Sequence, residues 1–127
     1  MLSEKSLTIT MDQAAELVAA VRKAETFFVE GFMYLSHPFY QRVVEVLKDG
    51  RLGRLRSIHG FYAAAISGVT NPLGRGTLYN LGCYPASLAH LVVQTMEGED
   101  AFGTARLSGF GVTEPDHGTV VDAAVTA

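Results

Sequence analysis

Two polar side chains, Asn80 and Tyr84, lie four positions apart where a glycine-rich turn joins an apolar run. Residues at positions i and i+4 share one face of a helix, so we expect the amide and the phenol to reach one ligand. A nearby ammonium would lower the pKa of a tyrosine phenol from about 10, because it stabilises the phenolate. A tyrosine beside a lysine therefore suits proton transfer between an alcohol and a carbonyl. The alternative is that Asn80 starts a helix and Tyr84 packs in the core.

The other candidate side chains give weaker signals. Lys5 lies in a polar opening segment and, taken alone, reads as a solvated lysine. Glu30 directly precedes Gly31 at the end of an apolar segment, where α/β proteins gather ligand groups, although a glutamate at the end of a strand is more often a solvated or capping residue. Cys83 has no activating neighbour, so we expect a small buried side chain. No metal site is predicted, because the spacing of the four histidines is not that of metal ligands.

Elements that position these residues follow from capping and periodicity. Thr10 and Gln13 have the form of a capping box, which predicts a helix over 11–24. Residues 26–30 are short, apolar and β-prone, as a buried strand should be. Further along we expect a helix from Pro38 to Gly50 capped by Ser36 or His37, a long strand over 55–65 and a loop over 67–75. After these we expect a helix from 78 to Gly98, a strand over 101–111, a turn over 114–118 and a partner strand over 120–127.

This order of elements predicts a mixed α/β (α+β) fold. Late strands joined by a hairpin favour an antiparallel sheet packed on helices. The opening helix–strand pair could instead close a parallel, doubly wound sheet. Both architectures contain a mixed set of helices and strands.

Length, composition and charge limit the classes of protein to which this chain can belong. A chain of 127 residues with 48% hydrophobic and 18% charged residues is expected to form one globular domain or part of one. A net charge of -3 predicts no nucleic-acid partner. One cysteine excludes an internal disulfide and fits a reducing compartment. Since no apolar run suggests a leader or a membrane span, the expected location is the cytoplasm.

Four segments resemble, in chain order, the sequence motifs of one protein family. Residues 4–7 (E-K-S-L) resemble E-K-P-L, and residues 30–38 resemble E-G-F-M-Y-R-x-H-P. Residues 52–55 resemble I-G-x-L/I, and residues 74–84 resemble G-G-G-x-L-x-D-x-G-x-Y. In this order, from residue 4 to residue 84, the four segments resemble motifs of the Gfo/Idh/MocA oxidoreductases, most closely the members similar to dihydrodiol dehydrogenase and glucose-fructose oxidoreductase.

The resemblance implies an N-terminal Rossmann domain that binds NAD or NADP and a C-terminal α/β domain. The second domain is built on an open, mostly antiparallel sheet that commonly forms the oligomer interface. Residues 1–31 would then be the end of the first domain and residues 32–127 part of the second. The chain would be a fragment, incomplete at both ends, of a homo-oligomeric enzyme.

The resemblance also implies roles for individual residues. Lys5 would lie near the nicotinamide and the substrate hydroxyl, and Tyr84 would be the acid–base residue. Asn80 stands where the family has an aspartate that orients substrate and base. Glu4 and Glu30 are expected, with Lys5, on the cofactor side of the site.

The sequence departs from the family pattern in ways that leave two hypotheses open. Asn80 cannot take up a proton, Ser6 replaces a proline, Leu35 replaces an arginine and Arg75 replaces a glycine. No phosphate-binding glycine fingerprint is present. The first hypothesis is an NAD(P)-dependent oxidoreductase acting on a sugar, polyol or dihydrodiol hydroxyl, inactive as an isolated chain that binds cofactor weakly. The second is a non-catalytic module for sheet-mediated oligomerisation or ligand binding.

Overall fold

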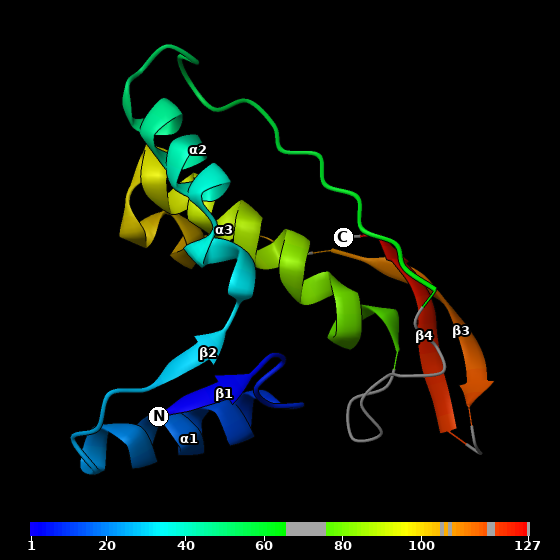
Figure 1. Cartoon of the computed structure of the whole chain (residues 1–127). Coiled ribbons are helices and arrows are strands. Elements are labelled where there is room, and N and C mark those ends of the chain that lie inside the picture. The colour runs from blue at the N-terminus through cyan, green and yellow to red at the C-terminus, as the bar shows by residue number, and fades with distance from the viewer. Residues whose placement is uncertain (66–75, 105, 107, 117–118, 127) are drawn as a thin grey trace.

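A computed structural model describes residues 1–65, 76–104, 106, 108–116 and 119–126 (Figure 1). Its helices and strands confirm the predicted mixed α/β class. In chain order the elements are β1 (Leu2–Glu4), α1 (Met11–Lys23), β2 (Val29–Gly31), the 3₁₀ turn η1 (Met33–Ser36), α2 (Pro38–Lys48), the π-helical turn η3 (Leu78–Gly82), α3 (Cys83–Glu97), the 3₁₀ turn η4 (Glu99–Thr104), β3 (Phe110–Asp116) and β4 (Thr119–Thr126).

The opening residues form a small β-α-β unit. β1 and β2 pair in parallel, with Leu2 opposite Val29 and Glu4 opposite Gly31, and α1 connects them. β1 has no signal in the sequence, because three residues with two polar side chains show no apolar alternation. A Cβ at Gly31 would lie 3.0 Å from the backbone oxygen of Ser3, so the close approach of the two strands requires glycine there.

The first two helices begin at the predicted residues. The backbone N–H of Gln13 donates to Thr10 Oγ1 at 3.3 Å and the Gln13 side chain bonds back, which confirms the capping box before α1. At α2 the alternatives for the cap are resolved in favour of His37, whose Nδ1 accepts from the Phe39 N–H at 3.1 Å. Pro38 then occupies the first turn, where its missing N–H costs nothing.

The third helix has two parts. η3 is a π-helical turn, and α3 continues from Cys83 to Glu97 before Gly98 ends it with a φ of 99°. A Cβ at Gly82 would lie 2.8 Å from Leu78 Cδ1, so the turn is tight at this junction. Single π-helical turns interrupt the regular i→i+4 ladder and recur at functional sites.

The predicted strand over 55–65 is wrong. This segment is extended but forms no ladder, and most of it is exposed, with Phe61 91% and Tyr62 49% accessible. β-prone sequence becomes a strand only when a neighbouring strand takes up its backbone groups, and no described strand pairs with it. The loop predicted to follow, over 67–75, lies outside the described residues.

The predicted hairpin near the C-terminus is confirmed. β3 and β4 pair antiparallel from Phe110 opposite Thr126 to Asp116 opposite Thr119. The strand predicted to begin at 101 is wrong, because the acidic residues Glu99 and Asp100 open the 3₁₀ turn η4 there. Most of the turn predicted over 114–118 is the end of β3, and positions 117–118 lie outside the described residues.

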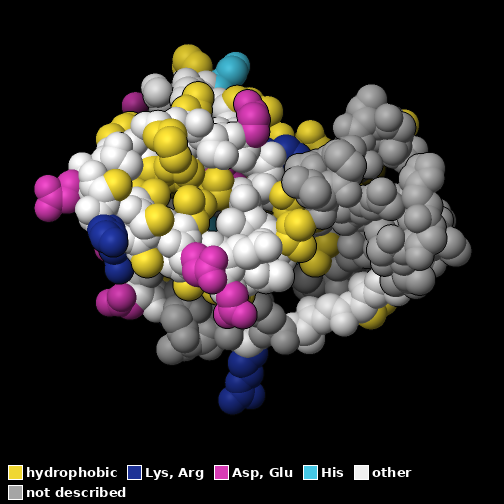
Figure 2. Space-filling view, turned by 90° about the horizontal axis from the view of Figure 1, so that it is seen from below, with side chains coloured by type: hydrophobic (Ala, Val, Ile, Leu, Met, Phe, Trp, Pro, Cys, Tyr) yellow, Lys and Arg dark blue, Asp and Glu magenta, His cyan; other side chains and the backbone are white. Residues whose placement is uncertain are grey.

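The described elements leave much apolar surface in contact with solvent. The accessible surface is 9925 Å², whereas a compact chain of this mass exposes about 6,600 Å². Among the described residues, the two most deeply buried are Asn80 and Leu81, both in η3, and each keeps a small exposed fraction. Figure 2 shows hydrophobic side chains spread over the visible face.

In Figure 1 the β1–β2 pair and the β3–β4 hairpin lie far apart, so the described part contains two small sheets, not one open sheet. None of the described helices is long and apolar enough to cross a bilayer.

Candidate active site

The loop after β1 docks on the π-helical turn η3. Lys5 Nζ donates to the backbone oxygen of Asn80 at 2.6 Å, and Ser6 Oγ donates to that of Tyr79 at 2.8 Å. The Tyr79 hydroxyl donates in return to the backbone oxygen of Ser6. Two consecutive carbonyls of the turn therefore accept bonds from two consecutive side chains of the loop.

Lys5 also lies over the ring of Tyr84. Its ammonium is 5.1 Å from the ring centroid, within the range of a cation–π contact. The structure thus brings Lys5, Asn80 and Tyr84 together, although about eighty positions of sequence separate the first from the last. Their catalytic roles stay a prediction.

Asn80 meets Lys5 through its backbone. The side chain of Asn80 is 5% exposed, and its Nδ2 donates to the carbonyl of Gly76 at 2.8 Å. The backbone N–H of Asn80 bonds to the same carbonyl at 3.2 Å. This amide therefore ties the start of η3 to the preceding turn, whatever else it contacts.

An aromatic cluster surrounds Tyr84. The ring of Tyr62 stacks on it at a centroid distance of 5.1 Å and an interplanar angle of 25°. The ring of Phe32 meets it edge-on at 6.1 Å, and that of Tyr34 is tilted at 6.4 Å. The phenolic hydroxyl of Tyr84 donates to Met33 Sδ at 3.8 Å. Because a thioether sulfur is a weak acceptor, the phenolic proton remains accessible to a stronger acceptor.

The pKa of the Tyr84 phenol is raised, which corrects the expectation that a lysine lowers it. Removal of the phenol from water is the main cause, and negative charge on Cys83, Tyr62 and Glu4 adds to it. The ammonium of Lys5 lies over the ring and bonds to a carbonyl, so the geometry does not pair it with the phenolate oxygen. The phenol therefore stays protonated at neutral pH.

The two glutamates of the cofactor side occupy different positions. Glu30 is the middle residue of the short strand β2. Its Oε1 accepts a hydrogen bond from the Leu7 N–H at 3.0 Å, and this bond holds the loop that carries Lys5. Glu4 ends β1, is exposed and pairs in register with Gly31. The Glu30 bond is to the loop between β1 and α1 and not to the end of a helix, and a cofactor role for either glutamate stays a prediction.

Sequence reasoning missed the contacts of four polar residues in this region. Besides Ser6 and Tyr79, these are Tyr34 and Ser87, whose hydroxyls are 2.8 Å apart. Ser87 Oγ also lies 3.0 Å from the Tyr84 carbonyl, to which it donates. No local pattern marks such pairs, since each joins residues more than fifty positions apart.

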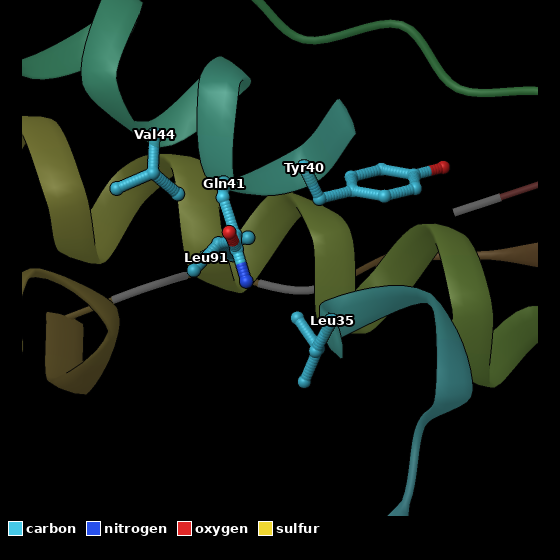
Figure 3. A pocket seen from close by; sticks show the side chains of 5 residues that line it. All are labelled: Leu35, Tyr40, Gln41, Val44 and Leu91. Atoms are coloured by element: carbon cyan, nitrogen blue, oxygen red, sulfur yellow. The ribbon is translucent and has the colours of Figure 1, made fainter. Parts of the chain in front are cut away.

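A separate hollow of about 250 Å³ lies between η1, α2 and α3 (Figure 3). Leu35 comes from η1, Leu91 from α3, and α2 supplies Tyr40, Gln41 and Val44. Its lining is mainly apolar and includes none of the predicted catalytic residues. Among the described residues, no group of three or more metal-ligating side chains could hold an ion.

Alignments with curated relatives cover most of this chain. A dTDP-3,4-didehydro-2,6-dideoxy-alpha-D-glucose 3-reductase of Actinomadura kijaniata is 33% identical over 99 residues, 71% of this chain and 29% of the relative. A trans-1,2-dihydrobenzene-1,2-diol dehydrogenase of Xenopus laevis is 29% identical over 117 residues, 89% of this chain and 36% of the relative. A D-xylose 1-dehydrogenase (NADP(+)) 2 of Haloferax volcanii is 28% identical over 100 residues, 74% of this chain and 30% of the relative.

The chain thus spans about a third of the length of these relatives. No protein-family model matches the chain, and no solved structure matches it significantly. The names of the relatives are those of oxidoreductases that act on sugars or diols. The similarity to Gfo/Idh/MocA-like oxidoreductases that the four sequence motifs indicate is therefore confirmed, at modest identity and over part of the relatives' length.

Proposed function

We propose that this chain carries the proton-transferring side of an NAD(P)-dependent oxidoreductase site, with a sugar, polyol or dihydrodiol hydroxyl as substrate. One observation supports this most directly: the ammonium of Lys5 is fixed over the ring of Tyr84 by a bond to the Asn80 carbonyl. A fixed cation beside a protonated phenol is what carbonyl reduction needs at the substrate oxygen. The substrate classes follow the printed names of the relatives.

Two side chains act on the substrate oxygen, one by proton transfer and one by stabilising charge. When bound, a nicotinamide would supply or accept the hydride at the adjacent carbon. Tyr84 donates its phenolic proton to the oxygen of a carbonyl that is being reduced, and takes it back when the alcohol is oxidised. Lys5 stabilises the negative charge that develops on the same oxygen. With its pKa raised, the Tyr84 phenol is protonated at neutral pH, which is the form that donates a proton when a carbonyl is reduced.

The described residues fit the nicotinamide end of a dinucleotide. β1 and β2 are parallel, and the loop that carries Lys5 begins at the carboxyl end of β1, the edge where open α/β sheets bind ligands. Glu4 and Glu30 lie at the same edge, so either could contact the ribose or the nicotinamide. This placement supports assigning residues 1–31 to a cofactor domain and residues 32–127 to a substrate and oligomerisation domain.

We propose further that the 127 residues alone bind the dinucleotide weakly and turn over no substrate, since the sequence holds no phosphate-binding glycine fingerprint. Titration with NADPH, followed by nicotinamide fluorescence, tests this. We expect no saturation up to millimolar cofactor. Micromolar binding would show that the residues present suffice for the cofactor site.

A non-catalytic module is the second candidate, and two observations favour it. The amide of Asn80, where the family has an acid, bonds to Gly76, and apolar side chains such as Phe27 (79% exposed) and Phe61 stay accessible. A module of this kind would self-associate through its sheet. It predicts a dimer in sedimentation and no turnover even with a cofactor domain supplied in trans. Turnover under those conditions would exclude it.

A further inference from the structure

Ser6 and Tyr79 form a reciprocal pair that spans the loop after β1 and the turn η3. The Ser6 hydroxyl donates to the carbonyl of Tyr79 at 2.8 Å, and the Tyr79 hydroxyl donates to the carbonyl of Ser6. Each residue therefore contributes one donor and one acceptor. Both bonds are half-buried, where competition from water is reduced.

The pair fixes the backbone on either side of the Lys5 contact. Ser6 directly follows Lys5, and Tyr79 directly precedes Asn80, whose carbonyl accepts from Lys5 Nζ. A lysine ammonium sits on a flexible four-carbon stem, so its position depends on how well its backbone and its acceptor are held. Nothing within the Lys5 side chain itself would keep it over the Tyr84 ring.

We propose that Ser6 and Tyr79 are positioning residues, which act through Lys5 by locking its loop onto η3. The functional value of that position rests on the proposed oxidoreductase activity, whereas the lock itself does not. A variant that lacks either hydroxyl still contains Lys5, but its ammonium is free to leave the Asn80 carbonyl and the Tyr84 ring. The effect of the Ser6–Tyr79 pair can therefore be measured from the position of the ammonium, with no cofactor or substrate present.

Lysine NMR on the whole chain tests this. The chain has three lysines, Lys5, Lys23 and Lys48, and the last two end helices α1 and α2. With ¹³Cε-labelled lysine, the ring current of Tyr84 should displace the Lys5 signal from those of the other two. We expect Tyr79→Phe to move the Lys5 signal to the position of the other two, while Tyr40→Phe, the same change on α2, leaves it displaced.

Ser6 provides the second variant, in case Tyr79→Phe does not fold. Ser6→Ala should give the same loss of displacement, and Ser6→Thr, which keeps the hydroxyl, should restore it. A displaced Lys5 signal in both Tyr79→Phe and Ser6→Ala would overturn the inference. Absence of hydride transfer in a loaded enzyme would instead count against the proposed function and leave this NMR result standing.

Discussion

The ammonium of Lys5 bonds to the backbone carbonyl of Asn80, 75 positions later in the chain. Because the acceptor is main chain, the bond does not depend on whether residue 80 is asparagine or aspartate. The amide of Asn80 has a separate task, a bond to the Gly76 carbonyl. An amide in place of the acid that the resemblance implies at position 80 thus leaves the bond between Lys5 and the backbone carbonyl in place.

Asn80→Asp should destabilise the fold. The Asp carboxylate would lose the bond to Gly76 and place a negative charge against that carbonyl in a site that is 5% exposed. We expect a loss of about 1–3 kcal/mol in the free energy of unfolding, measured in urea. Gln94→Glu makes the same chemical change on an exposed position of α3 and should stay within about 0.5 kcal/mol. Equal stability of Asn80→Asp and wild type would show that the Gly76 bond contributes little.

Alkaline pH should weaken the fold through Tyr84. Its folded-state pKa is raised, so the folded chain holds the phenolic proton more tightly than the unfolded chain. The contribution of the Tyr84 phenol to the free energy of unfolding is fully present below the unfolded-state pKa of about 10. It is lost as the pH rises through the folded-state pKa. Urea unfolding between about pH 8 and pH 11 should therefore show a steeper fall for wild type than for Tyr84→Phe. Parallel curves for the two proteins would contradict the raised pKa.

Gly31→Ala should separate β1 from β2. The added Cβ would lie 3.0 Å from the Ser3 backbone oxygen, which cannot move away without breaking the strand pairing. We expect a cost of about 1–3 kcal/mol and loss of amide-exchange protection in β1 and β2. Gly60→Ala is the matched control, because among the described residues its Cβ would meet only Pro85 Cβ, at 3.4 Å, an ordinary van der Waals distance. Unchanged protection in Gly31→Ala would mean that the strands tolerate the shift.

Glu30→Ala should loosen the loop that carries Lys5. It removes the acceptor of the Leu7 N–H, a hydrogen bond to a charged group worth about 1.5–3 kcal/mol. Glu30→Gln keeps a side-chain oxygen and should cost less. Amide exchange at Leu7 measures the effect directly. If both variants leave Leu7 protected, another group must hold the loop.

The helices were predictable because their signals are local. A hydroxyl and a glutamine three residues apart specify the start of α1, and a proline after His37 specifies that of α2. The strands were harder to predict, since they depend on partners. β1 has too short and polar a sequence to stand out, and the segment over 55–65 has the composition of a strand with no described neighbour to pair with.

The candidate site was predictable only in part. The motifs and the resemblance singled out Lys5, Asn80 and Tyr84, and the structure places them together. The direction of the Tyr84 pKa shift was predicted wrongly, because sequence spacing does not show that the lysine meets the ring face while burial acts on the hydroxyl. The lock between Ser6 and Tyr79 joins distant residues and had no signal in the sequence.

A chimera would show whether Tyr84 moves the proton in a hydride transfer. Residues 1–127 would replace the matching segment of the Xenopus laevis dihydrodiol dehydrogenase, to which 89% of this chain is similar. NADPH formation from NADP and a diol or sugar would be followed by absorbance. We expect turnover in the chimera and a loss of about 10²–10⁴-fold in kcat for Tyr84→Phe, with no matching loss for Tyr40→Phe. Turnover by the Tyr84→Phe chimera at the parent rate would contradict the account.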